Sequence, residues 1–158
     1  MPFKWSPELD TGIEVIDQQH RRIVDYINQL EEANQAGNRE LIGTTLNELV
    51  DYTMSHFAFE EGLQEEAGYP FCKPHKRVHE LFTRRIGDYV SRHQLGEDIG
   101  DELHTLLKTW LFNHIKRDDA DYVASVKASM QNIVAEKTRT AQQDDSSWFG
   151  RFFRRWTS

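Results

Sequence analysis

Five of the seven histidines, together with two carboxylates, form a pattern that could hold a pair of metal ions. The seven residues are His20, His56, Glu60, His75, His79, His114 and Asp119. Imidazole plus carboxylate is a ligand set that suits iron, and seven such ligands are more than one metal ion accepts. The composition therefore predicts a two-metal site, provided that the fold brings the seven side chains together.

Apolar residues that recur at alternating steps of three and four predict four helices, and the candidate ligands lie on them. The four apolar stripes lie within residues 16–30, 42–63, 75–89 and 103–114. Each stripe includes at least one of the candidate ligands, so these ligands face the expected core. A polar group in the core is costly unless it is paired or bound to a metal.

Short breaks separate the stripes and predict how the helices are connected. Gly37-Asn38, Gly68-Tyr69-Pro70 and Leu95-Gly96-Glu97-Asp98 are typical turn sequences. Such short connections force consecutive helices to run antiparallel. The predicted fold is therefore all-α: an up-and-down antiparallel four-helix bundle with an extra C-terminal helical segment. Ligands on neighbouring helices lie at similar distances from each turn, so we expect them to meet at one level of the bundle.

The last ligand pair leaves a choice between two aspartates. Residues four apart on a helix point to the same side, which favours Asp118 as the partner of His114. Asp119 lies five residues on, which is about 140° around an ideal helix. A new apolar stripe begins at Asp119 and continues through Val123, so the backbone is expected to change its register here. We therefore favour Asp119 and keep Asp118 as the alternative.

With these residues the chain resembles the hemerythrin family in its single-domain bacterial form, the bacteriohemerythrins. The family pattern of a lone His, then His-x3-Glu, His-x3-His and His-x4-Asp is complete, and the match covers roughly residues 3 to 135. The resemblance supports Asp119 over Asp118. It implies two iron ions that are bridged by Glu60, Asp119 and a hydroxide or oxide. One iron would take His75, His79 and His114. The other would take only His20 and His56, which leaves a position open for O2.

The resemblance implies O2 binding at a non-heme di-iron centre, and we predict reversible binding for oxygen storage or delivery. We do not predict an enzyme, because the sequence indicates no acid or base beyond the candidate ligands. Di-iron proteins that activate O2 usually have more carboxylates than this set contains, which agrees with that function. Two alternatives remain: a sensor of O2 or redox state that acts through a partner, and an enzyme that is a peroxidase or a nitric oxide scavenger. Four residues adjacent to the ligands are candidates for an apolar O2 pocket: Phe57, Trp110, Leu111 and Ile115.

Other titratable residues near the ligands in the sequence are predicted to have no part in the site. Glu61, Glu65 and Glu66 are expected to form a solvated face. His104 lies one residue off its stripe and is expected to be solvated, and His93 is expected near the end of its helix, far from the ligands.

Composition and charge narrow the class of protein. A chain of 158 residues suits one domain, and a net charge of −7 gives no support to nucleic-acid binding. Cys72 is the only cysteine, so no intramolecular disulfide can form, which suits a reducing compartment. No signal peptide or membrane-spanning segment is recognisable, and the predicted location is cytoplasmic.

The end of the chain does not fit the family pattern. Residues 136–147 are polar and are predicted to link the bundle, residues 1–135, to a tail, residues 148–158. As a helix, this tail would gather its aromatic residues on one face with its arginines outside that face, which is typical of a helix on an anionic membrane. The residues concerned are Trp148, Phe149, Arg151, Phe152, Phe153, Arg154, Arg155 and Trp156. We expect the tail to dock on the inner membrane surface or on a membrane oxidase or oxygenase. The alternative is that it folds back on the bundle.

Overall fold

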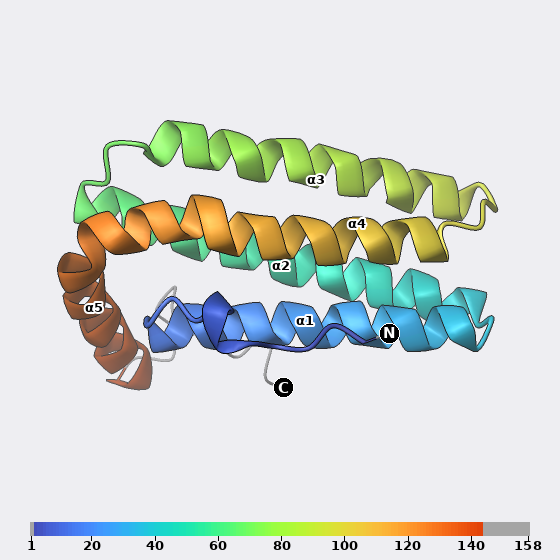
Figure 1. The fold of residues 1–158 in the computed structure, drawn as a ribbon, viewed down its shortest axis with the longest axis horizontal. Helices are drawn as coiled ribbons and strands as arrows, with labels where there is room; N and C mark the ends of the chain where they lie inside the picture. Colours follow the sequence, from blue (N-terminus) through green and yellow to red (C-terminus); the bar gives the residue numbers. More distant parts are fainter. Residues whose placement is uncertain (1, 144–158) are drawn as a thin grey trace.

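The structure, a computed structural model, describes residues 2–143, and these residues are largely helical (Figure 1). Four long helices form the bundle: α1 (Glu14–Gln35), α2 (Arg39–Ala67), α3 (Cys72–Gln94) and α4 (Gly100–Asn113). A short 3-10 turn, η1 (Pro7–Leu9), precedes them, and a π-helical turn, η2 (His114–Asp119), joins α4 to α5 (Ala120–Gln143). No β-strand occurs within residues 2–143, which confirms the predicted all-α class.

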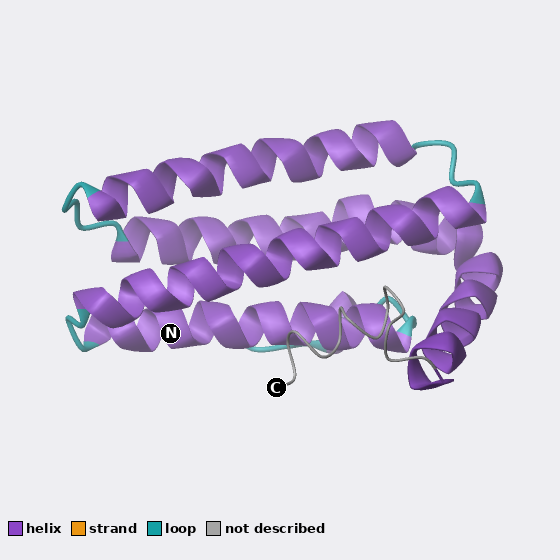
Figure 2. Ribbon diagram, turned by 180° about the vertical axis from the view of Figure 1, so that it is seen from behind, coloured by secondary structure: helices purple, strands orange, loops and turns teal. Residues whose placement is uncertain are grey.

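Consecutive helices run antiparallel, and their connections alternate between the two ends of the bundle (Figures 1 and 2). α1 packs against α2 and α4, and α2 packs against α3. α5 turns away from the direction of α4 and crosses the end of the bundle, where it contacts α2. The predicted up-and-down bundle with an extra C-terminal helical segment is therefore confirmed.

The predicted turns owe their tight geometry to glycine. Each of the three connections between the bundle helices contains a glycine with positive φ: 64° at Gly37, 71° at Gly68 and 96° at Gly96. After the left-handed Gly68, the backbone N–H of Tyr69 donates to the carbonyl of Gln64 at 3.0 Å. This hydrogen bond is typical of a helix that ends at a left-handed glycine, and it lets the chain reverse within a few residues.

The buried positions follow the predicted helical period. Every position of the predicted stripes is buried in α1 from Ile16 to Leu30, in α2 from Ile42 to Leu63 and in α3 from His75 to Tyr89. The apolar core falls into two clusters. The larger runs along the four bundle helices, and the smaller lies where α5 meets α1 and α2. The candidate ligands lie between the two clusters, so that apolar side chains enclose this polar level from both sides.

The helix α5 extends further than the sequence pattern suggests. Residues 136–143, which the sequence places in a polar linker, belong to α5. An ion pair helps to hold this stretch, because Nζ of Lys137 lies 2.6 Å from Oε1 of Glu66 in α2. Residues 144–158, which include the rest of the predicted linker and the predicted docking tail, lie outside the described residues. Within residues 2–143, no helix has both the length and the apolar character needed to cross a membrane.

Candidate metal centre

All seven predicted ligands lie together at one level of the bundle. They come from four helical segments: α1 supplies His20, α2 supplies His56 and Glu60, α3 supplies His75 and His79, and η2 supplies His114 and Asp119. None of the seven exposes more than 4% of its surface. The structure therefore brings together every member of the predicted set, from parts of the sequence that are far apart.

The π-helical turn η2 decides which aspartate reaches the centre. In a π-helix the hydrogen bonds join residues five apart, so His114 and Asp119 stand on the same side of the turn. Asp119 is fully buried, and its Oδ1 lies 3.2 Å from Nε2 of His114. Asp118 is partly exposed and contacts the outer ring nitrogen of His114, Nδ1, at 2.9 Å. The change of register that the sequence indicates at this point is the π-helical turn.

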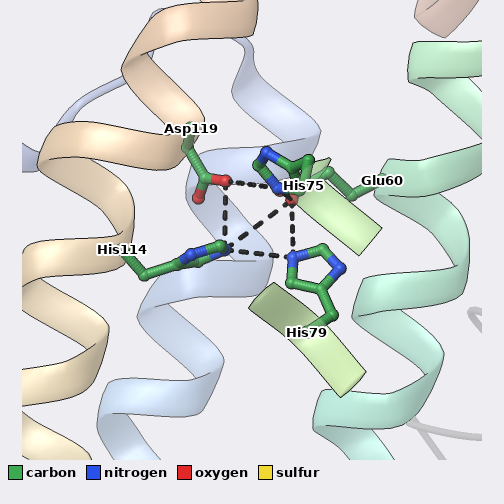
Figure 3. A group of neighbouring side chains, drawn as sticks. All are labelled: Glu60, His75, His79, His114 and Asp119. Atoms are coloured by element: carbon green, nitrogen blue, oxygen red, sulfur yellow. Dashed lines mark hydrogen bonds and ion pairs between the residues drawn. The ribbon is translucent and has the colours of Figure 1, made fainter. Parts of the chain in front are cut away.

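One half of the centre contains three imidazoles and one oxygen of each carboxylate (Figure 3). Oε1 of Glu60 lies 2.7 Å from Nε2 of His75 and 3.2 Å from Nε2 of His79. Oδ1 of Asp119 lies 3.2 Å from Nε2 of His75 and 3.2 Å from Nε2 of His114. These five side chains offer ligand atoms that all lie within 4.8 Å of one another. We call this group the three-histidine half.

The other half contains only two imidazoles, and they face the second oxygen of each carboxylate. Oδ2 of Asp119 lies 3.1 Å from Nε2 of His20. Oε2 of Glu60 lies 3.5 Å from Nε2 of His56 and 4.0 Å from Nε2 of His20. Both carboxylates therefore span the two halves, as ligands that bridge two cations would. We call this group the two-histidine half.

Hydrogen bonding within the protein leaves part of the centre unsatisfied. Both ring nitrogens of His20 and both oxygens of Asp119 lack a hydrogen bond of good geometry, although the two side chains are 3.1 Å apart. Buried polar atoms are rarely left without a partner. Ligand atoms that point into a shared volume, and not directly at each other, fit a bound cation.

The charge balance of the metal-free centre also favours a cation. Burial lowers the pKa of His75, but the negative charges of the neighbouring Asp119 and Glu60 carboxylates, at 3.2 and 2.7 Å from its Nε2, outweigh it and raise that pKa to about 9. Burial likewise lowers the pKa of His114, but the charge of Asp119 and a hydrogen bond to Asp118 raise it to about 10. The pKa of His56 moves the other way, because burial lowers it to about 3. The buried carboxylates thus draw protons onto His75 and His114, and metal ions can replace those protons.

The expectation that Glu61 belongs to a solvated face is wrong. Its Oε1 accepts a hydrogen bond from the Nδ1–H of His79 at 2.9 Å, and only 21% of its side chain is exposed. Glu61 therefore points between α2 and α3. The sequence does not indicate this, because the contact depends on how α3 is rotated against α2. Glu65 and Glu66 are exposed, as predicted.

Two further buried residues that the sequence analysis did not single out contact the ligands. Oε1 of Gln19 accepts a hydrogen bond from the Nδ1–H of His56 at 2.7 Å. The hydroxyl of Tyr122 donates to Oε2 of Glu60 at 3.0 Å. Both residues are near a ligand in the sequence, but a glutamine or a tyrosine at such a position carries no signal of its own.

The two remaining histidines take no part in the centre, as predicted, but His104 is not solvated. It is partly buried, with Nε2 at 3.6 Å from Oε2 of Glu31. His93 lies in the last turn of α3, where its ring packs closely against Gly43.

A small cavity lies where the sequence predicts an apolar pocket. Its volume is about 10 Å³, and it touches His56 and His114. Three of the four predicted pocket residues line it: Phe57, Trp110 and Leu111. The fourth, Ile115, is buried but packs in the larger apolar cluster and does not line the cavity. Ile115 directly follows His114, and neighbouring residues on a helix point about 100° apart, so Ile115 faces away from the side of His114 that touches the cavity.

Comparisons with known proteins agree with one another. Residues 11–126 match the family described as Hemerythrin HHE cation binding domain. A bacteriohemerythrin of Stenotrophomonas maltophilia is 51% identical over 151 residues, which cover 96% of this chain and 95% of the relative. A bacteriohemerythrin of Methylococcus capsulatus is 32% identical over 118 residues, which cover 74% of this chain and 90% of the relative. The crystal structure of a wild-type hemerythrin is similar with a TM-score of 0.73 and 30% identity, over 77% of this chain and 95% of that chain.

Proposed function

The chain belongs to the hemerythrin family, and from this premise we propose that its buried centre holds two iron ions and binds O2 reversibly, for storage or delivery. Glu60 and Asp119 would bridge the two irons, each with one oxygen in either half. The three-histidine half would hold one iron, and the two-histidine half would hold the other. When bound, the iron pair would supply the electrons and the open position that O2 binding requires.

The observation that carries the proposal is the unequal division of the centre. Glu60 and Asp119 contact imidazoles of both halves, but one half contains three imidazoles and the other two. An iron in the two-histidine half therefore lacks a protein ligand that its neighbour has. That difference leaves room for a small ligand beside His20 and His56.

The small cavity beside the centre suits a diatomic ligand better than an organic substrate. The cavity beside His56 and His114 has a volume of about 10 Å³, roughly the space that one water-sized molecule needs. Apart from the two histidines, Thr53 is the only polar residue among the described residues that line it. An apolar wall limits the approach of water and protons to the centre. The absence of an acid or base in this wall, other than the candidate ligands, favours a binding protein over a peroxidase.

We expect the purified protein to contain two irons per chain and to bind O2 reversibly. The reduced, iron-loaded protein should gain a visible absorption band in air and lose it under argon through repeated cycles. Elemental analysis and optical spectra check both points. One zinc per chain with no iron-dependent colour would contradict the proposal. A band that decays irreversibly in the first cycle while added peroxide is consumed would favour an enzyme.

A further inference from the structure

We propose that Glu61 and Asp118 are positioning residues that make the three-histidine half the tighter of the two metal positions. That half would then fill first and empty last. The inference rests on the two-metal centre proposed above, and it adds an order of occupancy and the residues that set this order. Neither residue belongs to the predicted ligand set.

Glu61 and Asp118 each bind a ligand imidazole on the side of the ring that faces away from the centre. Glu61 accepts the Nδ1–H of His79, and Asp118 accepts the Nδ1–H of His114, both at 2.9 Å. The other nitrogens of these two rings, Nε2, face the centre and lie 3.1 Å apart (Figure 3). A proton fixed on Nδ1 leaves the lone pair of Nε2 free to bind a metal.

The same two rings are also held on their faces by aromatic side chains. His79 stacks on Phe57 with ring centroids 3.8 Å apart and planes 6° apart. His114 stacks on Trp110 with centroids 4.4 Å apart and planes 15° apart. A ring fixed at both its face and its outer edge keeps its direction when no metal is present. Less conformational freedom is then lost when a metal binds.

The two-histidine half has weaker outer support. His56 donates to the neutral amide of Gln19, and Nδ1 of His20 has no hydrogen-bond partner among the described residues. A carboxylate strengthens an imidazole as a ligand more than an amide does, because its negative charge stabilises the positive charge on the metal side of the ring. The outer contacts therefore differ between the two halves in charge as well as in number.

The larger number of protein ligands also predicts tighter metal binding in the three-histidine half. An experiment must therefore separate the effect of ligand number from the effect of the outer contacts. The side chains of Glu61 and Asp118 are 21% and 38% exposed. Replacing them by their amides, Glu61→Gln and Asp118→Asn, retains the size of each side chain and leaves no buried charge without a partner. The inner ligands stay the same, while the outer support becomes similar to that of His56.

The test is a stepwise titration of the metal-free chain with Co²⁺, whose visible absorption reports its ligands. We expect two resolved steps in the wild type, and only the first of them in His20→Ala. In the Glu61→Gln/Asp118→Asn variant, the first dissociation constant should rise about 10- to 100-fold, with a smaller change in the second. Glu65→Gln is the matched control, since this exposed glutamate on the same helix contacts no ligand, and it should change neither step.

Unchanged first-step affinity in the double variant would overturn the inference, as would an equal weakening of both steps. Each single variant should show part of the effect, and circular dichroism of the metal-free chains checks that the helices are intact. The titration does not depend on O2. Two-step Co²⁺ binding without O2 binding by the iron form would therefore refute the proposed function and leave this inference standing.

Discussion

The Asp119→Ala substitution is expected to remove the paired metal site, whereas Asp118→Ala leaves two metals bound at saturating concentration. Asp119 places one oxygen in each half of the centre, 3.2 Å from Nε2 of His75 and 3.1 Å from Nε2 of His20. Its loss takes a ligand from both metals and removes one of the two bridges. In four-ligand zinc sites, metal binding contributes about 10–16 kcal/mol, which is about 3 kcal/mol per ligand. The loss of one ligand should therefore lower the metal affinity of each half about 100-fold.

The measurement is the number of irons bound per chain at a saturating iron concentration, together with the magnetic coupling between them. Coupling should vanish in Asp119→Ala and persist in Asp118→Ala. Asp119→Asn is a useful intermediate, because it retains the size of the side chain and removes the charge. If Asp118→Ala lost the coupling and Asp119→Ala kept it, the side-chain directions assigned to the π-helical turn η2 would be wrong.

The His20→Ala substitution is expected to abolish O2 binding, and His79→Ala is expected only to weaken metal retention. His20 is one of two imidazoles in its half, so its loss leaves an iron there with a single histidine and the two shared carboxylates. His79 is one of three, and His75 and His114 remain when it is removed. A protein with one firmly bound iron and no O2-dependent band is therefore the expected product of His20→Ala.

Optical spectra through air and argon cycles, combined with iron analysis on the same samples, measure this difference. His104→Ala is the matched control, because this partly buried histidine lies outside the centre. It should retain two irons and the reversible band. Equal loss of both irons from His20→Ala and His79→Ala would argue against an unequal division of the centre.

The bundle and the candidate ligands that enter its core are predictable from local sequence patterns. Helical periodicity is a local property, so it shows from residues such as Ile23 and Leu46 which face of each helix is buried. The three glycine-containing turns are also local, and their short length fixes the antiparallel order of the helices. Depth along each helix follows from counting residues, and for this reason the sequence predicts that His20 and His56 lie at one level of the bundle.

The choice of Asp119 over Asp118 is predictable in part from the sequence and depends in part on the structure. The new apolar stripe after His114 indicates a change of register, but the pattern does not show how the backbone accomplishes it. Hydrogen bonds between residues five apart in η2 supply the mechanism, because they place Asp119 on the same side as His114.

The contacts around the ligands depend on how the helices pack and do not follow from the sequence pattern. Whether Glu61 meets His79 or solvent depends on the rotation of α2 and α3 about their axes and on the distance between them. The same holds for Gln19 against His56 and for Tyr122 against Glu60. Periodicity defines a face about 100° wide or more, and within that width a side chain can reach a ligand or miss it. The family resemblance implied the division into two unequal halves, but periodicity alone does not predict it, because the division depends on which oxygen of each carboxylate faces which imidazole.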